Sequence, residues 1–331
     1  MLKKILASAT VAVSLFAGVA QAADLTLYSG RGESFVQPII NQFERDTGIK
    51  VNVRYGGTAQ LAVLIQEEGR RSPADVFWGQ DAGAMGALAN ANLLSTLPAS
   101  TFNDIPDIYR SESRQWIATS GRARVIAYST ERASADEIPE SVFALTEERF
   151  KGRIAIPPTN GGFQSFVTAM RVAHGDERTL EWLRGIKANE PKIFRNNTTA
   201  VAGIADGEAD FALVNSYYLP GFVARDPAFP VAQTFFENGD IGNLVNVAGV
   251  AILESSKNKS NAQKLVEYLI SPAAQQYFTS VVNEYPVTSN VISNPVLTDV
   301  KVVLEAAPRM NLDQLEDLEG TLTLIRRAGL L

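Results

Sequence analysis

The sequence predicts an α/β protein that folds into two lobes. Predicted strands and helices alternate along the chain, which is typical of parallel α/β layers. Of the 331 residues, the first 22 have the features of a removable leader, and the remaining 309 exceed what one hydrophobic core usually serves. Hydrophobic residues make up 46% of the chain, which is enough for packed cores in both lobes.

The first part of the chain shows this alternation most clearly. Short runs rich in β-branched and aromatic residues predict strands at 25–28, 49–55 and 73–78. Apolar residues at helical spacing predict helices at 35–43 and 59–68, and Thr47-Gly48 is the stop signal after the first of them.

The pattern continues through the rest of the chain, where several predicted strands end in Gly, Ser or Asn. Such strand ends are where open α/β sheets bind ligands, so we expect a ligand cleft there. No repeat, low-complexity segment or Pro-rich linker separates the lobes, and we expect the chain to cross between them more than once. The later strands are predicted at 116–120, 124–128, 153–156, 210–214 and 247–253, with helices at 181–187 and 261–270.

The N-terminus has the three parts of a secretory signal peptide. Lys3 and Lys4 precede an apolar stretch at 5–20, and Ala20-Gln21-Ala22 predicts cleavage after Ala22. The apolar stretch is shorter than the ~20 residues that a membrane-spanning helix needs. No cysteine follows it for lipid attachment, so we expect a soluble exported protein that does not span a membrane.

Charge and composition exclude several functions. The formal net charge is −6 and becomes −8 once Lys3 and Lys4 are removed, and no basic run favours a nucleic-acid partner. The chain has no cysteine, which excludes disulfides, thiol catalysis and thiolate metal sites. The single histidine, His174, is predicted in a polar loop, and a histidine-dependent hydrolase would have to be built on it. We expect no enzyme.

Two glycine-rich pieces each precede a predicted helix, Ser29-Gly30-Arg31-Gly32 and Thr159-Asn160-Gly161-Gly162. Exposed amides at a helix start can hold an oxyanion, and a nearby arginine adds charge. Neither piece matches a P-loop or a dinucleotide fingerprint, and glycine before a helix is more often a plain turn.

Tyr217 and Tyr218 lie side by side just beyond an apolar strand. A tyrosine pair is often only amphipathic surface or core. A hard trivalent cation offers a second explanation, because its charge favours loss of the phenol proton and no soft ligand is required. The pair is therefore a candidate site for iron(III).

Short strings spread over the whole predicted mature chain resemble the ferric-binding proteins of bacterial iron importers, a branch of the periplasmic binding-protein superfamily. Their combination is specific, although each alone is not. They are Leu27-Tyr28-Ser29-Gly30-Arg31, Ala59-Gln60-Leu61-Ala62 with Glu67-Glu68-Gly69, Ser72-Pro73-Ala74-Asp75-Val76-Phe77, Ser120-Gly121-Arg122-Ala123-Arg124-Val125, Asn215-Ser216-Tyr217-Tyr218 and Glu284-Tyr285-Pro286.

The resemblance implies a two-lobed periplasmic binding-protein fold, with a mixed, mostly parallel sheet flanked by helices in each lobe and a ligand cleft at the hinge. It places the crossings near Gly121, Leu244 and Tyr285. The first lobe would comprise 23–121 plus about 245–285, and the second 122–244 plus about 286–331. It further implies a periplasmic monomer that delivers its ligand to an inner-membrane ABC permease.

The resemblance also implies the site. Tyr217 and Tyr218 would bind Fe(III) as phenolates, together with carbonate or another synergistic anion. The anion-binding and cleft residues would be Ser29, Arg31, Gln80, Arg122, Asn160, Gly161, Gly162, Asn197 and Asn215.

Three positions depart from the family pattern. Gly32 stands where many members have His, Gln80 where they have Glu, and Phe163 where others have a further Tyr. Either an exogenous carboxylate, carbonate, phosphate or water completes the coordination, or the ligand is a small organic anion or phosphonate instead. Glu33 and Asp81 lie one position past the substituted sites and could compensate.

Overall fold

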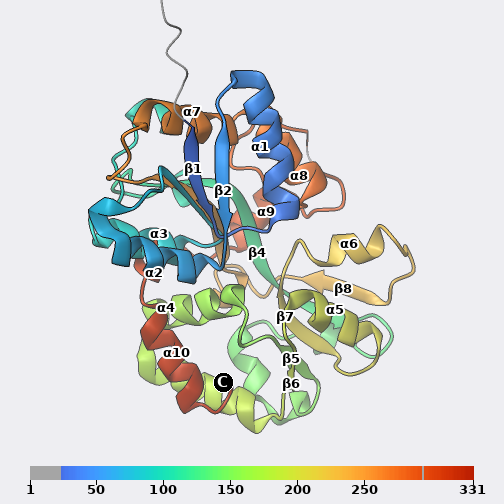
Figure 1. Cartoon of the computed structure of the whole chain (residues 1–331). Helices are drawn as coiled ribbons and strands as arrows, with labels where there is room; N and C mark the ends of the chain where they lie inside the picture. Colours follow the sequence, from blue (N-terminus) through green and yellow to red (C-terminus); the bar gives the residue numbers. More distant parts are fainter. Residues whose placement is uncertain (1–23, 293) are drawn as a thin grey trace, which may run out of the picture.

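The computed structural model describes residues 24–292 and 294–331, and the predicted signal peptide lies outside them. The described chain confirms the predicted α/β class, with helices on both sides of the strands in an upper and a lower body (Figure 1). The strands are β1 (Leu25–Ser29), β2 (Val51–Tyr55), β3 (Val76–Gly79), β4 (Ile117–Ser129), β5 (Ile154–Ile156), β6 (Lys192–Ile193), β7 (Phe211–Asn215), β8 (Val231–Thr234) and β9 (Val245–Ile252). The helices are α1 (Glu33–Thr47), α2 (Thr58–Glu68), α3 (Ala82–Asn90), α4 (Gly161–Ala188), α5 (Asn197–Ala205), α6 (Leu219–Val223), α7 (Lys259–Leu269), α8 (Pro272–Val281), α9 (Val300–Ala306) and α10 (Leu318–Arg327).

Within the described residues, the strands form one sheet in the order β2-β1-β3-β9-β4-β7-β5-β6, and β8 also pairs with β4. Pairing is parallel among β1, β2 and β3 and among β5, β6 and β7. It is antiparallel wherever β9 or β4 takes part. Each half of the sheet is therefore parallel at its outer edge and mixed at the centre.

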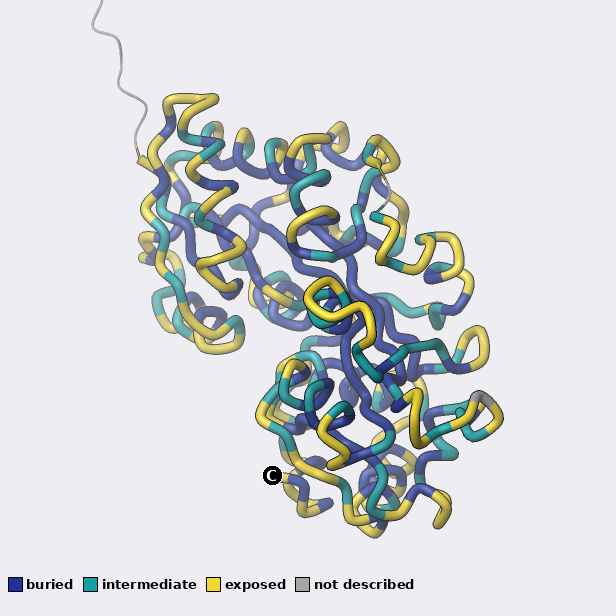
Figure 2. Tube along the Cα trace, turned by 90° about the vertical axis from the view of Figure 1, so that its right-hand side faces the viewer, coloured by how far each residue is buried: buried dark blue, intermediate teal, exposed yellow. Residues whose placement is uncertain are grey.

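Strand β4 joins the two halves of the sheet. Its first part, from Ile117 to Ala123, pairs with β9, and its second part, from Arg124 onward, pairs with β7 and β8. Almost every residue of β4 and β9 is buried, and buried residues run without interruption through the waist of the molecule (Figure 2). At the same place Gly121 pairs with Tyr285, with both N–O distances 2.8 Å.

The three predicted crossing points thus lie together at this waist. The residues that follow Tyr285 return to α8, where Gln275 accepts a hydrogen bond from the amide of Val287 (2.8 Å) and Asn294 donates to Thr279 (2.7 Å). The lobe boundaries stay a prediction.

The lower half of the sheet is covered on both faces. Phe211 and Leu213 of β7 face the core under α4, whereas Ala212 and Val214 face a second cluster against α5. Because successive side chains of a strand point to opposite faces, a strand buried on both faces is apolar throughout. This explains the uninterrupted apolar run at 211–214.

The structure differs from the predicted elements at β4. The sequence indicates two strands, at 116–120 and 124–128, with a break at the glycine between them. The structure has one strand of 13 residues, because Gly121 stays extended between β9 and Tyr285.

His174 is not in a loop as predicted. It lies inside the long helix α4, just before a kink at Gly175, whose φ of 81° suits glycine. Its ring packs edge-on against Phe143, with the ring centroids 5.0 Å apart, and burial lowers its pKa. The sequence predicts a separate helix at 181–187. In the structure these residues are the end of α4, which continues past the kink at Gly175.

A C-terminal segment, Asp313 to Asp317, ties the two bodies together along one side. Trp116 donates to Asp313 (2.7 Å), and Arg171 of α4 donates to Asp317 (2.9 Å). The backbone of this segment lies directly on α3, where an added Cβ on Gly83 would lie 2.3 Å from the carbonyl oxygen of Leu315.

We expect Gly83→Ala to lower the free energy of unfolding by about 1–3 kcal/mol, the usual cost of overpacking, since the neighbour is a backbone carbonyl. Gly221→Ala in α6 is the matched control, because a Cβ there meets nothing within 4 Å. Urea unfolding of both variants measures the difference. Equal stability of the two variants would contradict the close approach.

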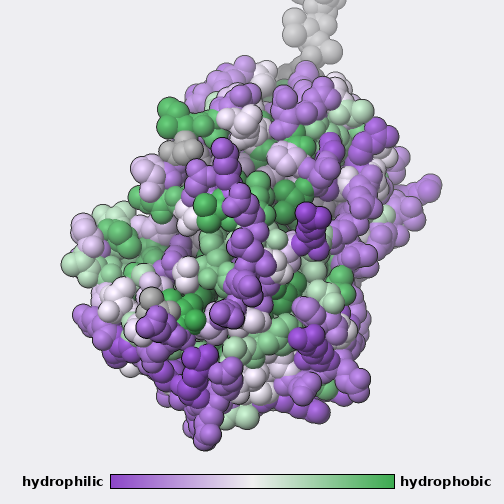
Figure 3. Space-filling model, turned by 180° about the vertical axis from the view of Figure 1, so that it is seen from behind, coloured by the Kyte–Doolittle hydropathy of each residue, from purple (hydrophilic) through white to green (hydrophobic). Residues whose placement is uncertain are grey.

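The surface is mainly hydrophilic on the face opposite to that of Figure 1, where hydrophobic side chains form separate patches (Figure 3). Among the described residues, no helix has the length and apolar character required to cross a membrane.

Candidate binding cleft

A cleft of about 890 Å³ opens between the two bodies. The upper body contributes the start of α2, Gln80, Asp81 and Arg122, and the lower body contributes the start of α4, Asn215 and Tyr218. The predicted site residues that line it are Gln80, Arg122, Asn160, Gly161, Gly162, Asn215 and Tyr218. Ser29, Arg31, Asn197 and Tyr217 are buried and do not form its wall.

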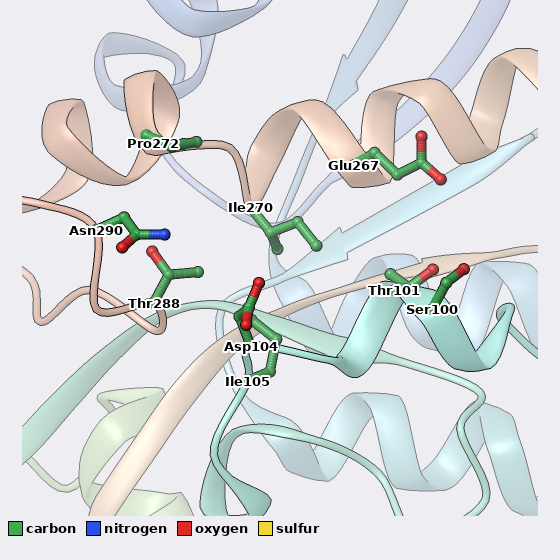
Figure 4. A pocket seen from close by; sticks show the side chains of 9 residues that line it. All are labelled: Ser100, Thr101, Asp104, Ile105, Glu267, Ile270, Pro272, Thr288 and Asn290. Carbon is green, nitrogen blue, oxygen red and sulfur yellow. The ribbon is translucent and has the colours of Figure 1, made fainter.

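A smaller pocket of about 290 Å³ lies elsewhere, between α7, the start of α8 and a short helical turn near Thr101 (Figure 4). Its wall contains Asp104 and Glu267 but none of the predicted site residues. The larger cleft is therefore the candidate site.

Tyr217 and Tyr218 lie in the short link between β7, which ends at Asn215, and α6, which begins at Leu219; Tyr218 lines the cleft and Tyr217 is buried beside it. Their rings are stacked, with centroids 4.2 Å apart, and the Tyr217 hydroxyl donates to the Tyr218 hydroxyl at 2.9 Å. Two adjacent oxygen ligands at about 2 Å from one octahedral ion are themselves about 2.8 Å apart. The phenol oxygens thus already have the spacing of two ligands of a single ion.

The protonation of this pair depends on its surroundings. Burial raises the pKa of Tyr217 well above its usual value, Tyr218 adds to the shift, and the positive charge of Arg122 opposes it. In the free protein Tyr217 is therefore a neutral phenol, and a metal ion would have to displace its proton.

Arg124 lies behind the tyrosines on β4. Its guanidinium donates to the side-chain oxygen of Asn215 (3.1 Å) and to the carbonyl of Leu213 (2.8 Å), both neutral groups. Burial lowers the pKa of Arg124 to about 9, and the two tyrosines act against that shift. A negative charge on either phenol would stabilise this buried cation.

Five of the nine predicted anion-binding or cleft residues come together at the start of α4: Asn160, Gly161, Gly162, Asn197 and Asn215. Asn160 caps this helix by accepting from the amide of Gly162 (3.0 Å), and it also accepts from the side chain of Asn197 (3.1 Å). A Cβ on Gly162 would lie 2.9 Å from the side-chain amide nitrogen of Asn215, so a larger residue would require the Asn215 side chain to move. Gly161 and Gly162 line the cleft, and the amides at the start of a helix are a common site for an oxyanion.

Four charged side chains are buried among the described residues, and all of them lie at the waist: Arg31, Arg122, Arg124 and Glu284. Arg31 is committed to Glu284, at 2.9 Å, and to the Ser120 hydroxyl, at 3.2 Å. Nη1 of Arg122 has no hydrogen-bond partner within the described part of the chain. Three cations against one anion leave an excess of two positive charges among these buried side chains, and the Asp81 carboxyl on the cleft wall also interacts with Arg122.

The positions that depart from the family pattern offer few ligands. Phe163 lies in the core, with its ring edge-on to Phe166. Gln80 is exposed, and its backbone amide donates to the hydroxyl of Thr58 (3.1 Å). Asp81 caps α3, and burial raises its pKa. In the described ranges 24–292 and 294–331, no group of three or more His, Asp or Glu residues is arranged so that it could hold a metal ion.

Sequence reasoning missed several residues of this region. Glu284 belongs to a string that was recognised, but nothing in the string indicates that its carboxylate meets two arginines. The wall formed by Leu315, Glu316, Leu318 and Leu322 was also missed, because an amphipathic C-terminal helix carries no binding signal. Arg124 could have been found, since it lies two positions after Arg122 on the same strand.

Comparisons with known proteins agree with this architecture. Residues 38–303 match the family model described as bacterial extracellular solute-binding protein. The chain is 36% identical to the major ferric iron-binding protein of Neisseria meningitidis serogroup B, over 97% of this chain and 98% of that protein. It is 30% identical to the Fe(3+)-binding periplasmic protein of Serratia marcescens, over 96% and 94%.

Solved structures show the same likeness. Iron-bound HitA from Pseudomonas aeruginosa superposes with a TM-score of 0.86 at 33% identity, covering 92% of this chain and 99% of that one. The Trichodesmium protein IdiA (FutA), in complex with iron and citrate ligands, gives a TM-score of 0.81 at 31% identity, covering 93% and 100%.

Proposed function

Because the chain belongs to the bacterial extracellular solute-binding proteins, we propose that it is the periplasmic component of an ABC importer and that it binds ferric iron. Its predicted two-lobed periplasmic binding-protein fold is confirmed. The observation that carries the proposal is the tyrosine pair, whose phenol oxygens lie 2.9 Å apart at the cleft.

The ligand set follows from the chemistry of the cleft. Tyr217 and Tyr218 bind Fe(III) as phenolates, and an exogenous anion such as carbonate completes the coordination. The anion lies at Gly161 and Gly162, where the amide of Gly161 and Nη1 of Arg122, which has no hydrogen-bond partner among the described residues, hold it, with Asn197 and Asn215 beside them; the amide of Gly162 already donates to Asn160.

The balance of charges at the cleft supports a ligand set of two phenolates and an anion. Burying an unpaired charge costs free energy unless a counter-charge compensates it. The waist holds an excess of two positive charges, and two phenolates with a dianion carry four negative charges against the three of Fe(III). The loaded site is therefore closer to neutral than the free one, and iron without an anion would leave a larger positive excess.

Binding ends in closure of the two lobes over the ion, a hinge movement about the β4 and β9 strands. We keep the predicted division into a first lobe of 23–121 plus about 245–285 and a second of 122–244 plus about 286–331, with Arg122 at the boundary and the residues directly after Tyr285 packed on α8 of the first lobe. The closed monomer delivers iron to an inner-membrane permease. No bond of the cargo is made or broken, so the protein is not an enzyme.

A small organic anion or a phosphonate is the second candidate cargo. It is favoured by Gly32 and Gln80, which remove two metal ligands of the family, and by the unpartnered nitrogen of Arg122. The tyrosine pair favours iron.

The test is a visible absorption titration of metal-stripped protein with ferric nitrilotriacetate, with and without bicarbonate. We expect a broad phenolate-to-iron band that saturates at about one iron per chain and is strongest with bicarbonate. A protein that stays colourless with bicarbonate, phosphate and citrate contradicts the iron proposal, and phosphonates would then be tested for binding to the same cleft.

A further inference from the structure

A buried ion-pair cluster lies at the waist, behind the cleft. Glu284 is 2% exposed, and it lies between Arg31 and Arg122, which are 4% and 3% exposed. One carboxylate oxygen, Oε2, accepts from Nη2 of Arg31 (2.9 Å) and from the hydroxyl of Ser120. The other oxygen, Oε1, lies 4.0 Å from Nη1 of Arg122, beyond hydrogen-bond distance.

The two arginines of this cluster differ in how many hydrogen bonds they make. Arg31 donates through both terminal nitrogens and also lies over the Trp78 ring, at 5.5 Å from its centroid. Arg122 makes one long hydrogen bond, from Nη2 to the carbonyl of Val247 (3.4 Å), and its Nη1 is unpartnered within the described residues. Arg122 lines the cleft, whereas Arg31 does not. The Arg31 guanidinium is therefore held through both of its terminal nitrogens, although its Nε has no hydrogen-bond partner among the described residues, whereas the Arg122 guanidinium is held only loosely by Glu284.

Strand geometry explains why these groups meet. Ser120 and Arg122 are two positions apart on β4, so their side chains share one face. The residue between them, Gly121, pairs with Tyr285, and this pairing brings the preceding residue, Glu284, to the same face. The cluster is thus built by the third crossing of the chain and moves with the hinge.

We propose that Glu284 is a positioning residue that sets how strongly the cleft binds its anion, because it competes with the anion for Arg122. This inference rests on the proposed function, in which Arg122 is an anion partner. With the cleft empty, the carboxylate is the nearest negative charge to Nη1 of Arg122 among the contacts described. An anion at the start of α4 offers the same nitrogen a direct hydrogen bond. Glu284 also repels that anion, and it therefore keeps the affinity low enough for release.

The test uses inorganic phosphate and metal-free protein, so that it does not depend on iron. The dissociation constant is measured by titration calorimetry for the parent and for Glu284→Gln, which keeps the shape of the side chain and removes its charge. We expect phosphate to bind about ten- to a hundredfold more tightly to the variant, since a buried charge close to the anion is removed. In an Arg122→Gln background, the same substitution should change the affinity by less than about threefold.

Glu254→Gln is the matched control. It removes the same charge from an exposed pair with Lys259, and it should leave the phosphate affinity within about twofold of the parent. Unchanged or weaker phosphate binding by a folded Glu284→Gln variant overturns the inference, as does an equal gain in the Arg122→Gln background.

Loss of a buried partner can also prevent folding, and circular dichroism of each variant checks this. If Glu284→Gln does not fold, Glu284→Asp keeps the charge but draws the carboxylate back from Arg122, and phosphate should then bind about threefold more tightly. Unchanged affinity in that variant overturns the inference.

The ferric titration distinguishes this inference from the proposed function. A ferric band together with unchanged phosphate binding by the Glu284 variant contradicts this inference alone. A change in phosphate binding without a ferric band contradicts iron as the cargo.

Discussion

Replacing both tyrosines of the cleft by phenylalanine will abolish ferric binding. Each substitution removes one phenolate and keeps the ring, so the stacking of the two rings at 4.2 Å can persist. We expect Tyr217→Phe/Tyr218→Phe to lose the visible band and to lower ferric affinity by about four orders of magnitude or more, which corresponds to about 5.5 kcal/mol. The measurement is a competition titration with nitrilotriacetate at fixed bicarbonate.

Tyr55→Phe is the control for this experiment. Tyr55 lies on β2, where its hydroxyl donates to Gln37 (2.8 Å), and the variant should keep the parent band. Unfolding in urea should show that the double variant loses no more than about 1–2 kcal/mol, the value of the hydroxyl–hydroxyl bond. A double variant that still forms the ferric band would show that other residues bind the metal.

Arg31→Met will produce the largest loss of stability among the waist residues. The substitution leaves Glu284 buried beside Ser120 and a guanidinium 4.0 Å away, and an uncompensated buried charge costs about 3–5 kcal/mol. We expect the free energy of unfolding, measured by urea denaturation at neutral pH, to fall by that amount. Arg31→Lys keeps the charge but cannot bind Glu284 and Ser120 with two nitrogens of one planar group, so it should be intermediate.

Lys259→Met provides the comparison on the surface. It breaks an ion pair with Glu254 in which both side chains are about half exposed, and such pairs contribute about 0–1 kcal/mol. Similar losses for Arg31→Met and Lys259→Met would mean that water or another group compensates Glu284 in the variant.

The sequence by itself was enough to predict that strands and helices form α/β layers in this protein. Runs such as 25–28 and 247–253 predicted strands because side chains that alternate across a sheet, or are buried on both its faces, leave a local pattern. It also supplied the candidate site residues, since the tyrosine pair and the two glycines at the start of α4 are each neighbours in the chain. The missed strands β6 and β8 are short, and their pairing depends on distant strands. Helices α8 and α10, of ten residues each, were not predicted either.

Only the tertiary structure shows which residues meet at the waist. Arg31, Ser120, Arg122 and Glu284 are separated by up to 253 positions in the chain, and only the pairing of Gly121 with Tyr285 brings them together. The same pairing keeps β4 continuous where its glycine predicted a break. A local pattern records which face of an element is buried, but it carries no record of which distant element covers that face. For this reason the ligand chemistry could be predicted from the sequence. The balance of charges around the cleft could not, because it depends on how the strands cross between the two bodies.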